Sequence, residues 1–249
     1  MSEREQVLLE TGFVLHQRAF RNTSQLLECI TAAHGRVGLV ARGSRAGRGT
    51  RRSPTSPQRA LLQPFVPLKL SWLARGELGR LTHVEPAAAP YALGADSLYA
   101  AYYANELLLR LLARGDPNAA VFSCYSRCLA VLAGGGRVAR VLRFFELELL
   151  GALGYGVELD SDAATGEPLV AERRYRFEAE VGVVAADAPR GDEPTYEGRV
   201  LISLRERILD DDDSLRAAQQ LLGTVLKAHL GDRPLKSRAV LRDIVARGL

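Results

Sequence analysis

The segment FVPLKLSWLARGELGRLTHV, residues 65–84, contains two short apolar runs on either side of the turn-forming pair Arg75-Gly76. In both runs the apolar residues alternate with polar ones or stand in short blocks. This is the two-residue period of a β-strand and not the 3.6-residue period of a helix. We therefore predict strands at 65–72 and 78–84, joined by a tight turn. The same pattern continues toward the N-terminus and predicts three further strands, at 12–16, 25–31 and 36–41.

Five short strands in about 75 residues suit a small Greek-key barrel of the OB type. Barrels of this type bind single strands or oligosaccharides on their strand faces and loops. The third connection, residues 42–60, is rich in Arg, Gly, Ser and Pro, and it holds too little apolar surface to pack. We therefore expect a barrel that presents a long basic loop.

Beyond Pro86 and Pro90 the apolar period lengthens from two residues to about 3.6, which predicts a helical region. Helices are expected at 96–113, 117–133, 138–153, 201–208, 214–229 and 237–246. Asp96 and Pro117 stand where an N-cap and a first-turn residue belong. The change of period predicts a domain boundary.

Residues 155–198 interrupt the helical pattern with two short strand candidates, at 174–177 and 181–186. We interpret this segment as an insertion that carries a hairpin. The predicted fold class is therefore α+β. An N-terminal OB-fold β-barrel in a domain of residues 1–85 is followed by a mainly helical C-terminal domain, residues 86–249, with the small β-hairpin insertion.

Charge is unevenly distributed along the chain. Residues 1–85 hold 13 Lys and Arg against 6 Asp and Glu, whereas residues 86–249 hold 20 against 23. Residues 29–76 contain nine basic side chains and no acid, where average composition would place roughly five or six acids. Clustered cations neutralise phosphates and release counterions, so this window indicates a surface that binds a polyanion. Its candidate DNA-binding residues are Arg36, Arg42, Arg45, Arg48, Arg51, Arg52, Arg59, Lys69 and Arg75.

Two alternatives bear on this window. Only three of the 33 basic residues are lysines, so the arginine usage also fits a GC-rich coding sequence, whereas the absence of acids does not follow from such usage. Phe65 and Trp72 could stack bases on the barrel, but a small barrel must also fill its interior, and we expect core packing for both.

Several classes of protein are excluded or disfavoured. No stretch of 18 uncharged apolar residues exists and the N-terminus lacks a secretory pattern, so we expect a cytoplasmic protein that engages no membrane. Cys29, Cys124 and Cys128 include no Cys-x-x-Cys pair, and the four histidines are scattered, so we expect neither a disulfide, nor a metal, nor a cofactor. The chain contains no P-loop motif and no nucleophile in a recognisable frame, which argues against an enzyme.

The four consecutive acids Asp210 to Asp213 directly precede Ser214 and a helical pattern. At that position they complement the helix dipole and cap the helix N-terminus. Paired carboxylates also serve two-metal phosphoryl transfer, so a metal-dependent nuclease is an alternative. Consecutive acids point in different directions, which favours the capping interpretation.

Four arginines, Arg110, Arg127, Arg140 and Arg143, lie on neighbouring helical segments, and Arg143 stands within an apolar run. A groove between such helices could bind an acidic peptide that ends in an aromatic residue, with Arg meeting the carboxylate. Solvated surface charge is the alternative interpretation.

Six segments of the chain form a further pattern. They are GFVLH at 12–16, GRVGLVARGSR at 35–45, LQPFVPL at 62–68, YANELL at 103–108, RFFELELLGALGYG at 143–156 and PLKSR at 234–238. In this order and spacing they resemble the bacterial RecO family of recombination mediators. The resemblance covers nearly the whole chain and implies the same OB barrel and helical domain that the change of period predicts.

The resemblance also implies a function. Proteins of this family bind single- and double-stranded DNA, anneal complementary strands and, with RecR, help RecA to load on DNA coated with single-strand-binding protein (SSB). They dock the acidic C-terminal tail of SSB on the helical domain, a role that the resemblance implies for Arg143, with Arg110, Arg127 and Arg140 as neighbours. It further implies association with the nucleoid and no nucleotide hydrolysis.

The chain departs from the family in its insertion. Some members carry a four-cysteine zinc site there, whereas residues 157–198 contain neither cysteine nor histidine. No metal is therefore expected. An RNA-binding or ribosome-associated OB-fold protein stays open as an alternative function, since the same basic loop would serve it.

Overall fold

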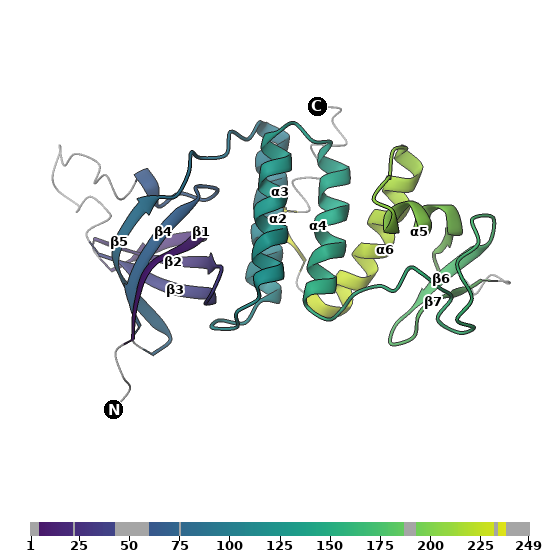
Figure 1. Cartoon of the computed structure of the whole chain (residues 1–249), viewed down its shortest axis with the longest axis horizontal. Helices are drawn as coiled ribbons and strands as arrows, with labels where there is room; N and C mark the ends of the chain where they lie inside the picture. Colours follow the sequence, from purple (N-terminus) through teal and green to yellow (C-terminus); the bar gives the residue numbers. More distant parts are fainter. Residues whose placement is uncertain are drawn as a thin grey trace. The chain divides into compact units, whose positions relative to one another are not determined.

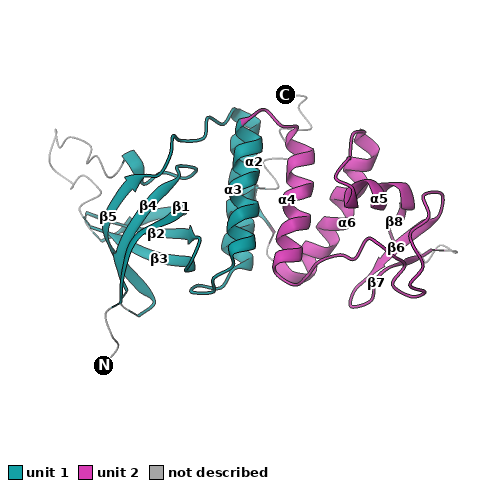
Figure 2. Cartoon of the chain, viewed as in Figure 1, with its two compact units in different colours: residues 1–133, 235–249 teal, residues 134–234 magenta. Residues whose placement is uncertain are grey.

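The computed structural model describes residues 5–21, 23–42, 60–74, 76–186, 193–231 and 234–237. The chain is organised in two compact units, which Figure 2 shows in different colours. Unit 1 comprises residues 1–133 and 235–249, and unit 2 comprises residues 134–234. The strand pattern ends at Pro86, where the period changes in the sequence, and the first two helices belong to the same unit as the strands.

Unit 1 is built on five strands that close into a barrel (Figure 1). The strands are β1 (Gln6–Phe20), β2 (Ser24–Thr31), β3 (Gly35–Ala41), β4 (Leu68–Leu73) and β5 (Leu78–Pro86). Their order around the barrel is β1-β2-β3-β5-β4, and all neighbours are antiparallel except β3 and β5. This architecture confirms the predicted OB-type barrel and the α+β class.

The starts of two strands differ most from their predicted bounds. β1 begins at Gln6 and is long enough to pair with both β2 and β4, with Gly12 opposite Thr31 on one side and Leu68 on the other. A Cβ atom at Gly12 would lie 2.7 Å from the carbonyl oxygen of Ile30, so glycine lets the two ladders meet there. β4 begins at Leu68 and not at 65, because Pro67 has no N–H to donate to a ladder.

Alternate residues of the strands point into the barrel and form its core. The interior includes Val7, Val14, Leu27, Cys29, Leu39, Leu62, Leu68, Leu70, Trp72 and Val84. Burial of each Leu or Val side chain contributes roughly 1.5–3 kcal/mol. Burial also raises the pKa of Cys29, and Cys124 and Cys128 are buried as well. The three cysteines therefore act as small apolar side chains, as predicted.

Two long helices follow the barrel within the described part of unit 1, α2 (Ala95–Leu111) and α3 (Ala119–Ala133). The ring of Phe13, on β1, lies 5.4–6.4 Å from those of Tyr91, Phe122 and Tyr125, which joins the barrel to the helices. Both helices were predicted, but the capping of each was wrong. Gly94 is the N-cap of α2 and Asp96 lies in its first turn. Pro117 precedes α3, and the side chain of Asn118 accepts from Val121 N at 3.0 Å.

Unit 2 contains three helices and a small sheet. The elements are α4 (Val138–Ala152), β6 (Arg174–Glu178), β7 (Gly182–Ala185), β8 (Thr195–Glu197), α5 (Gly198–Arg205) and α6 (Asp212–Leu230). β6 and β7 confirm the predicted hairpin, and β8 adds a third strand in the order β7-β6-β8. With three residues β8 is too short to show a period. The helix predicted at 237–246 extends beyond the described residues.

Hydrogen bonds and buried tyrosines hold the insertion together. Asp162 is 2 % exposed, and its carboxylate accepts from Ala164 N at 2.8 Å and from Ala185 N at 3.0 Å, which ties its loop to β7. Tyr175 Oη accepts from Val170 N at 2.8 Å. These contacts connect the loop to the sheet through backbone groups in a segment without cysteine or histidine.

Candidate nucleic-acid interface

The described residues include three of the nine basic side chains predicted to bind DNA. Arg42 is exposed in the turn after β3, and Lys69 on β4 donates from Nζ to Thr11 Oγ1 at 2.6 Å. Arg36 is half-buried at the start of β3. The other six lie outside the described residues: Arg45, Arg48, Arg51, Arg52, Arg59 and Arg75. Of the three described side chains, Arg42 is the one most open to a phosphate.

Arg36 makes bonds that connect the barrel to α2. Its Nε donates to Glu28 Oε2 at 2.9 Å, and its Nη1 donates to the carbonyl oxygens of Leu109 and Leu112 at 2.7 and 3.0 Å. Those carbonyls belong to the C-terminal end of α2, where a helix leaves acceptors unpaired and favours a cation. Arg114 binds the same Glu28 carboxylate from the segment after α2. The arrangement gives Arg36 a structural role, and its contact with DNA stays a prediction.

Glu28 lies between the two guanidinium groups. Burial alone would raise its pKa, but the hydrogen bonds from Arg114 and Arg36 outweigh burial and lower the pKa. In the sequence Glu28 stands one residue before the acid-free window. In the structure it compensates the charge of Arg36, so the window is less positive in space than its composition indicates.

We expect Arg36→Ala to lower the free energy of unfolding by about 2 kcal/mol or more, because hydrogen bonds between charged groups contribute about 1.5–3 kcal/mol. Its effect on the salt dependence of DNA binding should be small. Arg42→Ala is the matched variant and should leave stability unchanged, while each lost phosphate contact reduces the log-log salt slope by about 0.9. Thermal melting and DNA titrations at several salt concentrations measure both quantities. A shallower slope for Arg36→Ala with unchanged melting would assign Arg36 to DNA.

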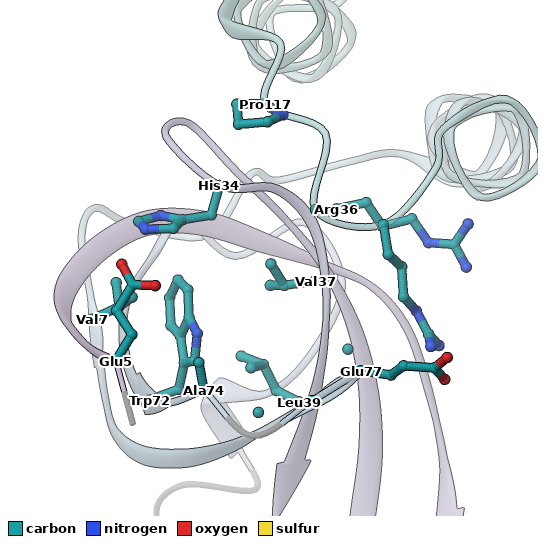
Figure 3. Close-up of a pocket in the computed structure, with 15 residues that line it drawn as sticks. Glu5, Val7, His34, Arg36, Val37, Leu39, Trp72, Ala74, Glu77 and Pro117 are labelled. Carbon is teal, nitrogen blue, oxygen red and sulfur yellow. The ribbon is translucent and has the colours of Figure 1, made fainter. Parts of the chain in front are cut away.

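One end of the barrel holds a pocket of about 550 Å³ (Figure 3). Its walls come from the start of β1, the β2–β3 turn, β3, the end of β4, the start of β5 and the segment between α2 and α3. Val37, Leu39 and Trp72 surround the hollow, and the side chains of Arg36 and Glu77 lie on the side opposite Trp72. The sequence did not indicate this pocket, because its walls come from residues as far as 112 positions apart, from Glu5 to Pro117.

The two aromatic residues considered for base stacking are buried. Phe65 is 5 % exposed, and its ring meets that of Tyr102 edge-on with centroids 5.0 Å apart. Trp72 is 4 % exposed and belongs to the barrel core. Core packing is thereby confirmed for both, and Trp72 also presents part of its surface to the pocket.

The four helical arginines divide between the units. Arg110 on α2 and Arg127 on α3 belong to unit 1, while Arg140 and Arg143 on α4 belong to unit 2. Arg143 is 6 % exposed and donates from Nη2 to Glu146 Oε1 at 2.6 Å. Arg140 donates to Asp210 Oδ1 at 2.8 Å. In unit 2, carboxylates of the chain itself therefore already bind both arginines predicted to dock an acidic tail.

The acidic run has four different sets of contacts. The partners of Asp210 to Asp213 are, in order, Arg140, the backbone of Ser214, Arg137 and Arg216. Asp211 Oδ1 accepts from Ser214 N at 2.7 Å and caps α6, which confirms the predicted capping. Hydrogen bonding from the side chain of Ser214, and then from its backbone, lowers the pKa of Asp211. Within the described residues no group of three or more His, Cys, Asp or Glu is placed to hold a metal ion. The carboxylates therefore support a cap and give the nuclease alternative no support.

Two of the quoted segments meet although they are 130 residues apart in the chain. The Glu106 carboxylate accepts from Lys236 N at 3.0 Å, from Ser237 N at 2.8 Å and from Ser237 Oγ at 2.5 Å. Burial alone would raise the pKa of Glu106, but these hydrogen bonds outweigh it and lower the pKa. Glu106 thus fixes the C-terminal segment of unit 1, a contact that periodicity could not reveal.

Comparison with known proteins gives a consistent result. Residues 6–90 match the family described as "Recombination protein O N terminal", and residues 94–239 match "Recombination protein O C terminal". A "DNA repair protein RecO" of Methylococcus capsulatus is 41% identical over 238 residues, covering 95% of this chain and 94% of the relative. The protein of that name from Nitrosococcus oceani is 42% identical over 238 residues, covering 96% and 94%. That of Haemophilus influenzae is 40% identical over 230 residues, covering 92% and 94%.

The two family matches follow one another along the chain and together cover the closed barrel, the helices and the insertion. None of the helices in the described ranges is both long enough and apolar enough to cross a bilayer. With relatives near 40% identity along almost their whole length, the chain belongs to the RecO family of DNA repair proteins.

Proposed function

We propose that this protein is a recombination mediator that binds single- and double-stranded DNA and anneals complementary strands. With RecR it would help RecA to load on SSB-coated DNA, and it would act at the nucleoid. Membership of the RecO family establishes the broader role in DNA repair and recombination. One observation carries the finer proposal: the window of nine basic residues and no acid belongs to a closed barrel of the OB type.

Annealing by such a surface requires no catalytic residue. Two DNA strands repel each other through their phosphates, and a surface that neutralises both lowers this repulsion. Arginine contacts to phosphates carry no sequence information, so they can be exchanged as bases pair. This supports a mediator that holds strands and leaves their chemistry unchanged.

Partner docking is assigned to the helices. We propose that the acidic C-terminal tail of SSB binds near Arg143, with Arg110, Arg127 and Arg140 contributing, and that RecR binds elsewhere. Arg143 already binds Glu146, and Arg140 already binds Asp210. The carboxylates of the tail would therefore have to displace those two side chains. An aromatic residue at the end of the tail would add an apolar contact and so favour binding of the tail.

Replacing Arg48, Arg51 and Arg52 together with alanine is expected to weaken DNA binding and to make its salt dependence shallower. If each contacts one phosphate, the log-log slope falls by about 2 to 3 in total. Replacing Arg174, Arg199 and Arg216 is the matched control, because it removes the same charge from exposed positions in unit 2 that pair with acids or with Thr195. Equal slopes for the two triple variants would refute the role of the loop.

The RNA-binding alternative is separated from the proposal by a direct comparison. Affinities for DNA and RNA strands of identical sequence test the nucleic-acid preference. Strand annealing, measured with and without SSB, tests partner docking. A clear preference for RNA, or failure to anneal DNA, would favour the alternative.

A further inference from the structure

The proposed arginine contacts to phosphates do not involve the pocket at the end of the barrel, which has the size and the lining of a ligand site. Its volume of about 550 Å³ falls in the range of 300–1,000 Å³ typical of small-molecule sites. All the residues that line it belong to unit 1 and are described in the structure. It is therefore a defined feature of one compact unit.

The inner wall of the pocket is apolar and aromatic. Val7, Val37 and Leu39 contribute aliphatic side chains, and the rings of His34 and Trp72 meet edge to face with centroids 5.2 Å apart (Figure 3). A flat ring that enters the hollow can lie against the aromatic surface, as bases do on aromatic side chains in proteins that bind single strands.

The polar groups of the pocket require a ligand with polar edges. The carboxylates of Glu5 and Glu77 line the pocket. A purely apolar side chain from a partner protein would cover these groups without satisfying them, which is unfavourable. A ring with donors and acceptors on its edge can pair with them.

The charges at the pocket favour a neutral ring that is attached to an anion. The pocket is lined by the carboxylates of Glu5 and Glu77 and by the guanidinium groups of Arg36 and Arg114. Because both guanidinium groups already bind Glu28, the hollow offers no excess positive charge to an anion inside it. The side chain of Arg114 is 36% exposed, which leaves part of its guanidinium open to an anion outside the hollow. A nucleobase with its phosphate combines these properties.

We propose that the open end of the barrel binds one unstacked nucleobase of a single strand, between the His34 and Trp72 rings and the aliphatic wall. This deepens the proposed function and rests on it, because the arginine contacts to phosphates would hold the strand while the pocket takes a base. A base in the pocket cannot pair with a complement. The site therefore favours single strands and must release its base when the duplex forms.

Trp72 provides a direct test, because it is the only tryptophan of the chain and it lines the pocket. The full-length protein is titrated with a labelled 15-residue oligothymidylate and with an oligomer of abasic residues that has the same number of phosphates. Fluorescence anisotropy of the label reports binding, and tryptophan emission reports the pocket. We expect both oligomers to bind, the thymidylate at least about fivefold more tightly, and only the thymidylate to change the emission of Trp72.

Two variants at different walls make the test specific. His34→Ala removes one ring, and Ala74→Leu fills space at the end of β4; each should bring the two affinities closer together and leave binding of the abasic oligomer unchanged. His83→Ala is the matched control, because His83 lies on β5, outside the pocket, with a side chain that is 54% exposed. It should keep the wild-type preference.

The outcomes separate this proposal from the one on which it rests. If both oligomers bind with equal affinity and Trp72 emission does not respond, the pocket takes no base, while DNA binding through phosphates stands. If the preference for thymidylate survives in both pocket variants, the base contact lies elsewhere and the pocket proposal is overturned. If neither oligomer binds at low salt, both proposals fail.

Discussion

Gly35→Ala is expected to destabilise unit 1 by about 3 kcal/mol or more. Gly35 begins β3 with φ of 62°, a conformation that costs a residue with a Cβ atom roughly 1–2 kcal/mol. The added Cβ would also lie 2.0 Å from the carbonyl oxygen of Asp116 and 3.0 Å from Pro117 N. Because these are backbone atoms, the segment between α2 and α3 would have to move, and overpacking of this kind typically costs about 1–3 kcal/mol more.

Gly76→Ala is the matched control for this prediction. Gly76 has nearly the same φ, 57°, but a Cβ there would meet nothing within 4 Å. It should therefore show only the conformational cost, about 1–2 kcal/mol. Denaturant unfolding followed by Trp72 emission reports on unit 1 in both variants, since Trp72 lies in the barrel core. Equal losses of unfolding free energy in the two variants would show that the contact with Asp116 adds no cost at Gly35.

The comparison of Gly35 with Gly76 also shows what could be predicted from the sequence. The break between the strands predicted at 25–31 and 36–41 and the pair Arg75-Gly76 both indicated connections between strands, and β2–β3 and β4–β5 are antiparallel neighbours, since the signal for a turn is local. Asp116 lies 81 residues beyond Gly35, so its approach depends on how the helices pack on the barrel. The strands and their turns were predictable, whereas the contacts that make one of these glycines critical were not.

The same distinction applies to the charged residues. The acid-free window indicates a surface that binds a polyanion, which stays a prediction, and it could not show that Glu28 binds Arg36 and Arg114 from outside the window. Likewise, an arginine within an apolar run could equally be a docking residue or a buried partner of Glu146, because residues three apart on a helix lie side by side. Charge counted along a chain indicates a class of ligand, and only the fold determines which cations are already paired.

The pocket and the insertion illustrate a further limit. His34, Leu39 and Trp72 each had a clear local interpretation as turn or core, yet together they line a hollow at the end of the barrel. In the insertion, nothing local indicated that the Asp162 carboxylate binds the backbone of β7. Both features arise from tertiary contacts, which bring together residues that a periodic pattern treats separately.

Asn105→Ala is expected to destabilise unit 1 by about 2–5 kcal/mol. Asn105 on α2 is 2 % exposed; its Nδ2 donates to Leu15 O at 2.9 Å, and its Oδ1 accepts from Tyr125 Oη at 2.6 Å. Burial raises the pKa of Tyr125 well above its ordinary value, so its hydroxyl stays protonated and acts as a donor. Alanine leaves both partners buried without this bond, and each unsatisfied group costs about 1–3 kcal/mol.

Tyr125→Phe distinguishes loss of this hydrogen-bond chain from loss of volume. Phenylalanine keeps the aromatic contact of Tyr125 with Phe13 but leaves Asn105 Oδ1 without its donor, at a cost of about 1–3 kcal/mol. Both single variants remove the same Asn105–Tyr125 hydrogen bond. The double variant should therefore lose less free energy of unfolding than the sum of the two single losses. Additive losses in urea unfolding would mean that the two side chains act independently. A coupling of about 1 kcal/mol or more would show that Asn105 and Tyr125 stabilise unit 1 through the hydrogen bond that they share.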